Sequence, residues 1–442
     1  MAVIRVSGPD AIRITDTVFK GKALPDQPTH TIHYGHIMDG ETVVDEVMVS
    51  LFRSPKSFTA EDTTEISCHG SPIIAQKIIQ LLIRHGAVPA QPGEFSLRAF
   101  LNGRIDLSQA EAVADLIQAQ SEASLRLALD QMKGGFARKI RELRQQLIDY
   151  KALVELELDF GEEDVAFADR EKMQSLMKDI RGIIRPLAES FRSGQVIREG
   201  IQTVLAGKPN AGKSTLLNAM LQEERALVSD IAGTTRDTIE ESLHLKGMLF
   251  RFIDTAGLRE SEDVIERMGI ARTRESIQKA HLLILIVDVS QTSAEDIKEQ
   301  LREIDTGQKT VIIVANKTDL LSDEELSDRL KQLSTCGFPV VCISALHGGG
   351  IDQLREELVA AGERECKTEE GGVIISNMRH YEALIRADEA LEQVAVGLKM
   401  GATGDIVSLN LRDALEALGQ ISGTISNEEV LGSIFSRFCI GK

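Results

Sequence analysis

A glycine-rich loop that ends in a lysine and a serine is the most chemically informative feature of the sequence. It runs from Gly207 to Gly212, Lys213 and Ser214 and fits the pattern G-x-x-x-x-G-K-[ST]. Glycines at these places let backbone N–H groups wrap around phosphate oxygens at the start of a helix. Lys213 would reach the β- and γ-phosphates, and Ser214 would hold Mg²⁺. The loop therefore predicts a nucleoside triphosphate site.

Two further motifs indicate where the terminal phosphate and the metal ion would lie. One is Asp254-Thr255-Ala256-Gly257, which follows the apolar residues 249–253. A carboxylate there can meet Mg²⁺ through the water shell of the metal, and the Gly257 N–H can meet the γ-phosphate. The other is Gly-Thr-Thr-Arg-Asp at 233–237, which lies between the phosphate loop and Asp254. A switch threonine is expected there, and Thr235 is the predicted Mg²⁺ ligand.

Two motifs predict which base the site accepts. Asn316-Lys317-Thr318-Asp319 follows the apolar residues 311–315. The Asp319 carboxylate can accept hydrogen bonds from N1 and N2 of guanine, whereas adenine offers no such pair, and a lost bidentate contact costs about 1–3 kcal/mol. Ser344-Ala345-Leu346 follows residues 340–343 and matches the last guanine-contact loop. Together the two motifs predict GTP rather than ATP.

The group that orients the attacking water is not at its usual position. Small GTPases carry a glutamine directly after the D-x-x-G motif, and here that residue is Leu258. Hydrolysis must then be organised by an acidic residue, by a cation or by a partner. The acidic candidates that follow Leu258 are Glu260, Glu262, Asp263 and Glu266. The residues alone leave this choice open.

The phosphate loop and the guanine-side motifs follow segments with the pattern of buried strands. Residues 203–206, 282–287, 311–315 and 340–343 are almost wholly apolar, and helical segments separate them. Continuous apolar strands between helices predict a parallel sheet that is covered on both faces. The carboxyl ends of its strands would carry the motifs. The order of the motifs makes residues 201–360 resemble the translation-factor-related class of GTPases.

Other patterns flank this α/β region. Residues 1–110 combine short alternating segments, turns and a helical pattern over 72–85, which indicates a small α+β domain. Apolar residues at steps of three and four over 125–158 predict one long helix, bent at Gly134-Gly135, whose stripe lies in a bundle core. Helical patterns return at 381–398 and 406–418 after a polar linker at 363–372. This order favours one bundle with the α/β domain inserted, although two separate helical domains would give the same pattern.

Composition excludes several other classes of protein. Of the 442 residues, 43% are hydrophobic and 27% are charged, so a sizeable core is expected. Lys and Arg number 50 against 68 Asp and Glu, and the net charge of −18 excludes a uniformly positive nucleic-acid-binding surface. The cysteines are widely spaced with no C-x-x-C, which indicates reduced thiols and a cytoplasmic setting. A secretory signal and a membrane-spanning apolar run are not expected.

Longer matches make the chain resemble the MnmE (TrmE) family of tRNA-modification GTPases. The matching segments are GKPNAGKS, DIAGTTRD, DTAGLRE, PGEFSLRAFLNGRIDL at 92–107 and the terminal FCIGK. Only Met1, Ala2 and Val3 precede Ile4, where the family usually has a longer segment. The resemblance implies a multidomain protein of α/β and all-α parts. An α+β domain for tetrahydrofolate binding and dimerisation would span 1–110, a helical domain 111–200 and 363–442, and an inserted Ras-like G domain 201–362.

The resemblance also implies the activity and its partners. The protein would be a homodimer that joins the flavin protein MnmG in a heterotetramer. Together they would add an aminomethyl or carboxymethylaminomethyl group to carbon 5 of the wobble uridine of certain tRNAs. A folate such as 5-formyl-tetrahydrofolate would supply the one-carbon unit. GTP hydrolysis, activated by K⁺ and by dimerisation of the G domains, would drive the cycle.

By motif position, the resemblance assigns a folate site and a role for the C-terminal tail. The folate would be bound by Arg5, Glu65, Arg104 and Lys442. The cationic side chains would face the carboxylates of the folate, and Glu65 would accept from the amino group of the pterin. Cys439 matches the tail cysteine of the family, which is associated with the modification and not with GTP hydrolysis.

For the nucleotide site, the resemblance adds a K⁺ ion and selects one acid. The ion would be held by Asn210, Ser229, Ile231 and Thr234, and would supply the charge that an arginine finger supplies elsewhere. Glu266 would position the attacking water through a water bridge, with Lys213 as a second catalytic residue. The predicted GTP-binding residues are Asn210, Ala211, Gly212, Lys213, Ser214, Thr215, Ser229, Asp230, Ile231, Ala232, Gly233, Thr234, Thr235, Asp254, Thr255, Ala256, Gly257, Asn316, Lys317, Asp319, Ser344, Ala345 and Leu346.

A non-catalytic alternative stays open from the G domain alone. A GTP-dependent assembly factor or ribosome-associated switch could carry the same G domain, with the N-terminal domain as a binding module. The N-terminal folate positions and the FCIGK tail favour the enzyme.

Overall fold

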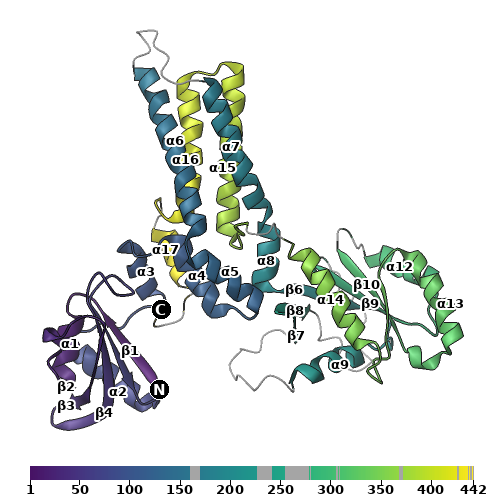
Figure 1. Ribbon diagram of the computed structural model, residues 1–442, viewed down its shortest axis with the longest axis horizontal. Coiled ribbons are helices and arrows are strands. Elements are labelled where there is room, and N and C mark those ends of the chain that lie inside the picture. The colour runs from purple at the N-terminus through teal and green to yellow at the C-terminus, as the bar shows by residue number, and fades with distance from the viewer. Residues whose placement is uncertain are drawn as a thin grey trace. The chain divides into compact units, whose positions relative to one another are not determined.

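The computed structural model of the chain describes residues 1–159, 170–225, 241–253, 278, 280–304, 307, 309–367, 372–425, 428–436, 438 and 441. These residues form two compact units (Figure 1). The first consists of Met1–Gln118, Ala128–Ile183 and Glu382–Lys442, and the second of Ala119–Leu127 and Ile184–Tyr381. In chain order, the main part of the second unit therefore lies inside the first.

The first unit begins with an antiparallel five-stranded sheet in the order β1-β5-β4-β3-β2. Its strands are β1 (Ala2–Ser7), β2 (Phe19–Lys20), β3 (Thr31–Asp39), β4 (Thr42–Phe52) and β5 (Thr63–Cys68). Alternate residues of β4, among them Val47 and Val49, are buried in one core with residues of helices α1 (Ala11–Val18) and α2 (Pro72–Arg84). The side chains between them, such as Met48, point to the exposed face, as the alternation predicts.

The helical part of the first unit is a bundle. It contains α4 (Leu107–Gln118), α6 (Gly135–Asp159) and α16 (Gly404–Ser422). It also contains those parts of α5 (Glu122–Met132), α7 (Arg170–Glu189) and α15 (Met378–Met400) that fall within the first unit. Figure 1 shows α6, α7, α15 and α16 running side by side. The Arg181 guanidinium on α7 donates to the Asp388 carboxylate on α15 at 2.7 Å. The first half of this bundle comes before the inserted unit in the chain and the second half after it.

The prediction of one long helix over residues 125–158 is wrong. The segment forms two helices, α5 and α6, which are separated at Gly134. The φ of Gly134 is 72°, a left-handed conformation that glycine adopts without steric cost. Ile140 and Leu147 on α6 are fully buried, as the stripe predicts, whereas Leu125 and Leu129 on α5 are exposed. The two helices therefore do not share one buried stripe.

A C-terminal helix packs against a short helix of the N-terminal part. Helix α17 (Glu428–Phe435) ends in Phe435, and Phe438 follows it. The rings of both residues are buried in a cluster with Leu107, against which Leu97 and Phe100 of α3 (Glu94–Leu101) pack. Gly93, just before α3, has a φ of 70°, and a Cβ there would lie 2.5 Å from the Phe435 carbonyl oxygen. This close approach requires glycine at that position.

The second unit contains a six-stranded sheet in the order β11-β10-β9-β6-β8-β7, in which only the β7–β8 pairing is antiparallel. Its strands are β6 (Ile201–Ala206), β7 (Glu241–Leu245), β8 (Met248–Ile253), β9 (Leu282–Asp288), β10 (Thr310–Asn316) and β11 (Val340–Cys342). The helices are α8 (Phe191–Glu199), α9 (Lys213–Arg225), α12 (Ala294–Ile304), α13 (Asp323–Leu333) and α14 (Ile351–Glu365).

Strand β9 shows why its apolar run is continuous. Leu282, Ile284 and Ile286 lie in a core with residues of α9 and α14. Leu283 and Leu285, on the other face, lie in a core with residues of α12 and α13. The prediction of a parallel sheet covered on both faces is confirmed for these strands. The predicted linker at 363–372 begins too early, because α14 continues through Glu365.

The strand order fixes where a ligand of this sheet binds. Strand β6 lies between β8 and β9, so the order of the sheet reverses there. In open α/β sheets, ligands bind outside the carboxyl ends of the strands at such a reversal. The loop that follows β6 is the predicted phosphate loop.

Candidate functional site

The phosphate loop joins β6 to α9, as its motif predicts. Gly207 and Gly212 have φ values of 145° and 98°, and Asn210 lies in the left-handed region at 60°. A Cβ on Gly207 would lie 2.2 Å from the carbonyl oxygen of Ile286, and one on Gly212 would lie 2.2 Å from Asn316 Nδ2. Backbone conformation and packing therefore both require the two glycines.

Lys213 curls its ammonium group back over this loop. Its Nζ donates to the carbonyl oxygens of Gly207 at 2.8 Å and Lys208 at 3.0 Å. Burial lowers the pKa of Lys213, because a desolvated ammonium is disfavoured. Within the described ranges, its hydrogen bonds are to these carbonyl oxygens and not to a carboxylate. A cation that no described acid neutralises, at a glycine loop before a helix, fits a phosphate group.

The loop after β10 is fastened to the phosphate loop by Asn316. Its side chain is buried, with Nδ2 donating to the Ala211 carbonyl oxygen at 2.8 Å. Its Oδ1 accepts from the Ala345 N–H at 3.0 Å. The Ser344 hydroxyl donates to Asp319 Oδ1 at 2.5 Å, and this hydrogen bond lowers the pKa of Asp319. The guanine-side motifs thus meet at one edge of the sheet, with the Asp319 carboxylate charged at neutral pH.

Asp288 belongs to the same edge and was missed by the motif reasoning. It ends β9 and is the register partner of Asn316. Its Oδ2 accepts from Lys317 Nζ at 2.7 Å, and its Oδ1 accepts from the Ser290 hydroxyl at 2.5 Å. Burial raises the pKa of Asp288, but the hydrogen bonds from Lys317 and Ser290 outweigh it, so the pKa is lowered. The one available sequence signal is a carboxylate at the end of a buried strand.

The other residues of the predicted nucleotide set divide into two groups. Ser214 and Thr215 lie in the first turn of α9, and Leu346 is exposed after the Ser344 loop. The following predicted residues lie outside the described residues: Ser229, Asp230, Ile231, Ala232, Gly233, Thr234, Thr235, Asp254, Thr255, Ala256, Gly257 and Glu266. Cys439 and Lys442 of the tail lie outside them as well.

Of the predicted folate residues, the structure brings Arg5 and Glu65 together. They are register partners on β1 and β5, and Arg5 Nε donates to Glu65 Oε1 at 2.8 Å. The Arg5 guanidinium lies 5.3 Å from the ring centroid of Phe58 and 5.4 Å from that of Phe95. Arg104 lies beyond the end of α3, where its side chain is exposed, and the described contacts do not join it to the Arg5–Glu65 pair.

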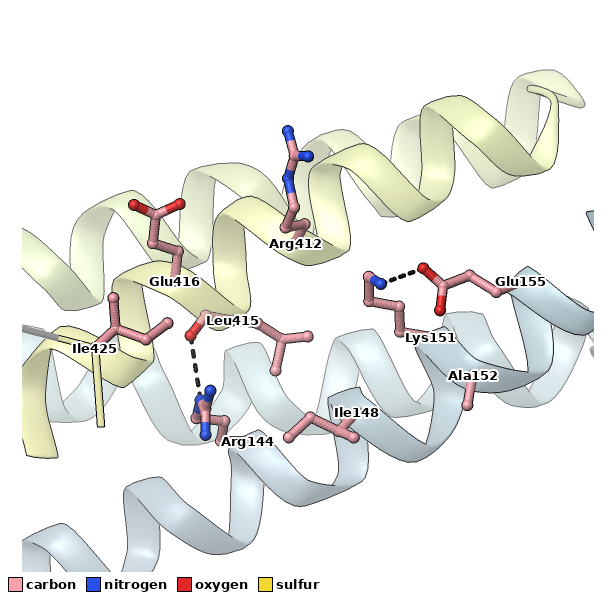
Figure 2. A pocket seen from close by; sticks show the side chains of 9 residues that line it. All are labelled: Arg144, Ile148, Lys151, Ala152, Glu155, Arg412, Leu415, Glu416 and Ile425. Carbon is pink, nitrogen blue, oxygen red and sulfur yellow. Dashed lines mark hydrogen bonds and ion pairs between the residues drawn. The ribbon is translucent and has the colours of Figure 1, made fainter. Parts of the chain in front are cut away.

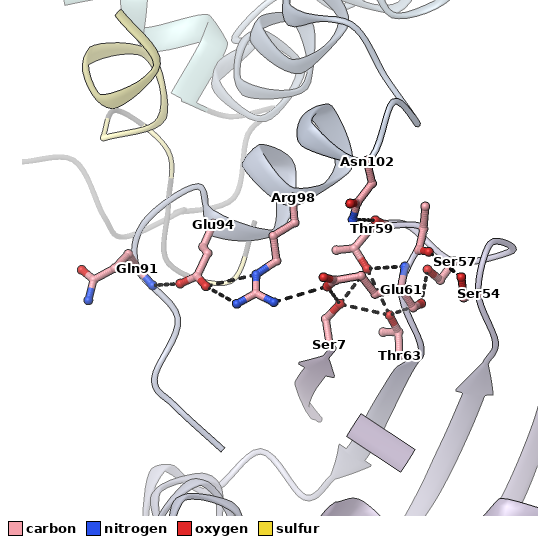
Figure 3. Close-up of polar contacts among 11 residues, drawn as sticks. Ser7, Ser54, Ser57, Thr59, Glu61, Thr63, Gln91, Glu94, Arg98 and Asn102 are labelled. Atoms are coloured by element: carbon pink, nitrogen blue, oxygen red, sulfur yellow. Dashed lines mark hydrogen bonds and ion pairs between the residues drawn. The ribbon is translucent and has the colours of Figure 1, made fainter. Parts of the chain in front are cut away.

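A polar network holds α3 against the end of this sheet (Figure 3). The Arg98 guanidinium donates to Glu94 on its own helix at 2.6 Å and to Glu61 at 3.4 Å. Glu61 also accepts from the Ser7 hydroxyl at 2.8 Å, and Asn102 Nδ2 donates to the Thr59 carbonyl oxygen at 2.7 Å. The network holds α3 in place, and α3 positions the ring of Phe95 beside Arg5.

A cavity of about 450 Å³ lies between α6 and α16 (Figure 2). Ile148 and Leu415 lie at its floor, and the Arg144 side chain donates to the Leu415 carbonyl oxygen at 3.3 Å. Figure 2 shows the Arg412 and Glu416 side chains pointing away from this floor. The Lys151 ammonium, also at this cavity, is paired with the Glu155 carboxylate on the same helix.

No described helix has the length and apolar character needed to cross a membrane. The strand order, the phosphate loop and the joined guanine-side loops define the class of protein: a P-loop GTPase domain inserted into a helical one, after an N-terminal α+β part. Profiles of two families match the chain: the MnmE helical domain over residues 107–439, and the GTP-binding protein TrmE N-terminus over residues 1–104.

Full-length relatives carry the same name. The chain is 47% identical to the tRNA modification GTPase MnmE of Christiangramia forsetii, over all of this chain and 96% of that protein. It is 48% identical to the MnmE of Cytophaga hutchinsonii, over all of this chain and 95% of that protein. The chain belongs to the MnmE family of tRNA modification GTPases. As a member it is an enzyme, a GTP hydrolase that takes part in tRNA modification.

The similarity to a solved structure is confined to part of the chain. The G domain of the T. maritima FeoB iron transporter matches with 27% identity, over 36% of this chain and 98% of that one, with a TM-score of 0.26.

Proposed function

We propose that the protein is a K⁺-activated GTPase that works with a flavin protein of the MnmG type. Together they add an aminomethyl or carboxymethylaminomethyl group to carbon 5 of the wobble uridine of certain tRNAs. The observation that carries the GTPase part is the hydrogen bond from Asn316 to Ala211, which joins the guanine side to the phosphate side. Because the two sides are joined, one nucleotide can contact both loops.

Phosphate binding begins with Lys213 and the backbone of the phosphate loop. The Lys213 ammonium would exchange its carbonyl partners for β- and γ-phosphate oxygens, which favour its charged form. Ser214 and Thr235 would hold Mg²⁺, and Asp254 would meet the metal through water. Bound Mg²⁺ would neutralise charge that develops on the phosphates. On the base side, Asp319 would accept from guanine N1 and N2 with the orientation that Ser344 gives it.

Leu258 stands where small GTPases have a water-orienting glutamine, and we propose that a K⁺ ion and an acidic residue together replace it. The proposed K⁺ ligands are Asn210, Ser229, Ile231 and Thr234. Asn210 supports the proposal because it lies in the phosphate loop, where its amide oxygen is a hard donor close to the phosphates. Glu266 would hold the attacking water through a second water molecule. The other proposed ligands, Ser229, Ile231 and Thr234, lie outside the described residues.

The folate is proposed to bind where Arg5 and Glu65 meet, with Arg104 and Lys442 completing the site. The rings of Phe58 and Phe95 beside Arg5 support this position, because a flat pterin requires apolar faces to pack on. Glu65 would accept from the pterin amino group, and the cations would face the carboxylates of the folate. Cys439 is proposed to serve the modification and not GTP hydrolysis.

The homodimer is proposed to form through the N-terminal part. One row across the outer face of its sheet consists of Tyr34, Met48, Ser67 and Val3, in register on four strands. Tyr34, Met48 and Val3 are exposed, and exposed apolar side chains gathered on one face are typical of protein interfaces. This supports dimerisation by residues 1–110.

We further propose a helical domain at 111–200 and 363–442, an inserted G domain at 201–362, and a cytoplasmic protein. Because the net charge is −18, tRNA would be bound by local basic patches or by the flavin partner. The protein and the flavin partner would form a heterotetramer.

Binding of 5-formyl-tetrahydrofolate by the intact chain tests the proposal against a non-catalytic GTP switch. Titration calorimetry should show binding that weakens when Arg5→Gln removes the cation, while the GDP affinity stays unchanged. The matched control is Arg84→Gln, which breaks an exposed ion pair with Asp39 in the same part of the chain. A wild-type dimer that binds GTP but no folate would favour the switch instead.

A further inference from the structure

We infer that Asp288 is a positioning residue for the nucleotide base: it holds the ammonium of Lys317, so that the aliphatic stem of that lysine forms a fixed surface under the guanine. The inference rests on the proposed GTP site. It adds to that site the loop after β9, which no motif of the sequence contains.

The carboxylate of Asp288 is held in place by Ser290 and Lys317. One oxygen accepts from Ser290 twice, from its hydroxyl at 2.5 Å and from its backbone N–H at 3.0 Å. The other oxygen accepts from Lys317 Nζ at 2.7 Å. The Asp288 side chain is 14% exposed, so water screens this ion pair less than it screens a surface pair. The two hydrogen bonds from Ser290 therefore orient the carboxylate so that its other oxygen faces Lys317.

The position of Asp288 in the sheet explains why it can reach the base loop. Asp288 and Asn316 are partners at the carboxyl ends of neighbouring parallel strands, β9 and β10. The Val289 N–H donates to the Asn316 carbonyl oxygen at 3.0 Å and extends the pairing by one residue. Lys317 follows directly, and its ammonium returns toward β9.

Lys317 is thereby held at both ends of its side chain. Its backbone lies in the left-handed region, with a φ of 65°, between the buried Asn316 and the loop to Asp319. Its ammonium is bound to Asp288. A free lysine stem loses up to about 2 kcal/mol of rotamer entropy when a ligand fixes it. Holding the stem in advance removes part of that cost from nucleotide binding.

This arrangement makes a prediction that separates Asp288 from Asp319. A surface under the flat face of the base does not depend on the 2-amino group of guanine or on the γ-phosphate. Asp288→Asn should therefore weaken GDP, GTP and inosine diphosphate by the same factor. Asp319→Asn should weaken GDP more than inosine diphosphate, because the latter has no 2-amino group to lose.

The experiment measures the affinity of the full chain for fluorescent GDP, with GTP and inosine diphosphate as competitors. Asp288→Asn should weaken all three about tenfold or more, since a hydrogen bond to a charged group is lost. Asp288→Glu keeps the charge and should recover most of the affinity. The matched control is Asp328→Asn, which breaks an exposed Lys–Asp pair with Lys331 on α13 of the same unit. Its affinities should equal those of the wild type.

GTP turnover gives a second readout, because a general structural defect would lower kcat, whereas loss of base positioning should change only KM. At saturating GTP, the kcat of Asp288→Asn should equal that of the wild type, with the whole effect in KM. Should Asp288→Asn fail to fold, Ser290→Ala keeps both charges and removes only the orienting hydroxyl. It should weaken GDP and inosine diphosphate equally, by about threefold.

Three results would overturn the inference: wild-type affinity in Asp288→Asn, a lower kcat at unchanged KM, or unequal losses of GDP and inosine diphosphate. A wild-type chain that binds neither GDP nor GTP would instead refute the nucleotide site itself.

Discussion

The Asn316 side-chain amide donates to the carbonyl oxygen of Ala211 at 2.8 Å across 105 residues of sequence, and its oxygen accepts from the Ala345 N–H. One buried side chain thus connects the phosphate loop, the loop after β10 and the loop after β11. Because buried amide groups are costly to leave unpaired, the three loops hold one another in place.

Replacing Asn316 with Ala should loosen all three loops at once. The Ala211 carbonyl and the Ala345 N–H would lose their partner, at a cost of about 1–3 kcal/mol for each buried group left unpaired. We expect faster amide exchange at Ala345 in the nucleotide-free protein and weaker GDP binding. Unchanged exchange at Ala345 would contradict the bridging role.

Gly212→Ala should lower the affinity for GDP by about tenfold or more, because residues other than glycine are strained at positive φ. The new Cβ would also lie 2.2 Å from Asn316 Nδ2 and would displace the bridge described above. GDP affinity measures the effect.

A glycine in open space provides the control for this change. Gly182 lies exposed inside α7, and a Cβ there meets nothing within 4 Å. Gly182→Ala should leave GDP affinity unchanged and should stabilise its helix by about 0.5–1 kcal/mol. Equal GDP affinities for the two alanine variants would contradict the packing argument.

The N-terminal sheet should lose stability in acid through Asp45. Burial raises the pKa of this carboxyl, but hydrogen bonds from the His69 backbone N–H at 2.9 Å and from His69 Nδ1 at 2.8 Å outweigh it and lower the pKa. A folded pKa below the unfolded one contributes stability above the unfolded pKa, and that stability is lost as the pH falls through the folded pKa.

Asp45→Asn should therefore destabilise β4 and β5 at pH 7 and have progressively less effect below about pH 4. Amide exchange in these strands, corrected for the intrinsic effect of pH, measures the difference. Asp39→Asn removes only an exposed pair with Arg84 and serves as the control. A constant difference between wild type and Asp45→Asn from pH 7 to pH 3 would contradict the assignment.

Features that the sequence predicts well are those encoded by neighbouring residues. The phosphate loop follows β6 because an apolar run, the glycines and the start of a helix are contiguous in the chain. The burial of β9 on both faces follows from its unbroken apolar run.

Features that depend on residues far apart in the chain were not predictable. A single aspartate at a strand end is common, so nothing in the sequence links Asp288 to Lys317. The ring of Phe95 reaches Arg5 only because α3 folds back onto the sheet, whereas Phe58 reaches it from the segment between β4 and β5. At Gly134-Gly135 the sequence predicts a bend in one helix, whereas the structure has two separate helices there.

Glu266→Ala should lower GTP turnover while GTP binding survives, because Glu266 has no motif role in nucleotide contact. Single-turnover hydrolysis and GTP affinity, measured on the same preparation, separate the two effects. Glu260→Ala, an acid of the same segment, is the matched control and should hydrolyse GTP at the wild-type rate. Loss of GTP binding in Glu266→Ala would assign that residue to structure.

The most direct test of the account is steady-state GTP hydrolysis by the full chain in KCl and in NaCl of equal ionic strength, with and without the flavin partner. Leu258 stands where small GTPases have a water-orienting glutamine, and the proposed substitute is a K⁺ ion beside the phosphates. The account predicts turnover in K⁺ that is several-fold higher than in Na⁺ at saturating GTP. Equal rates in the two salts would contradict it.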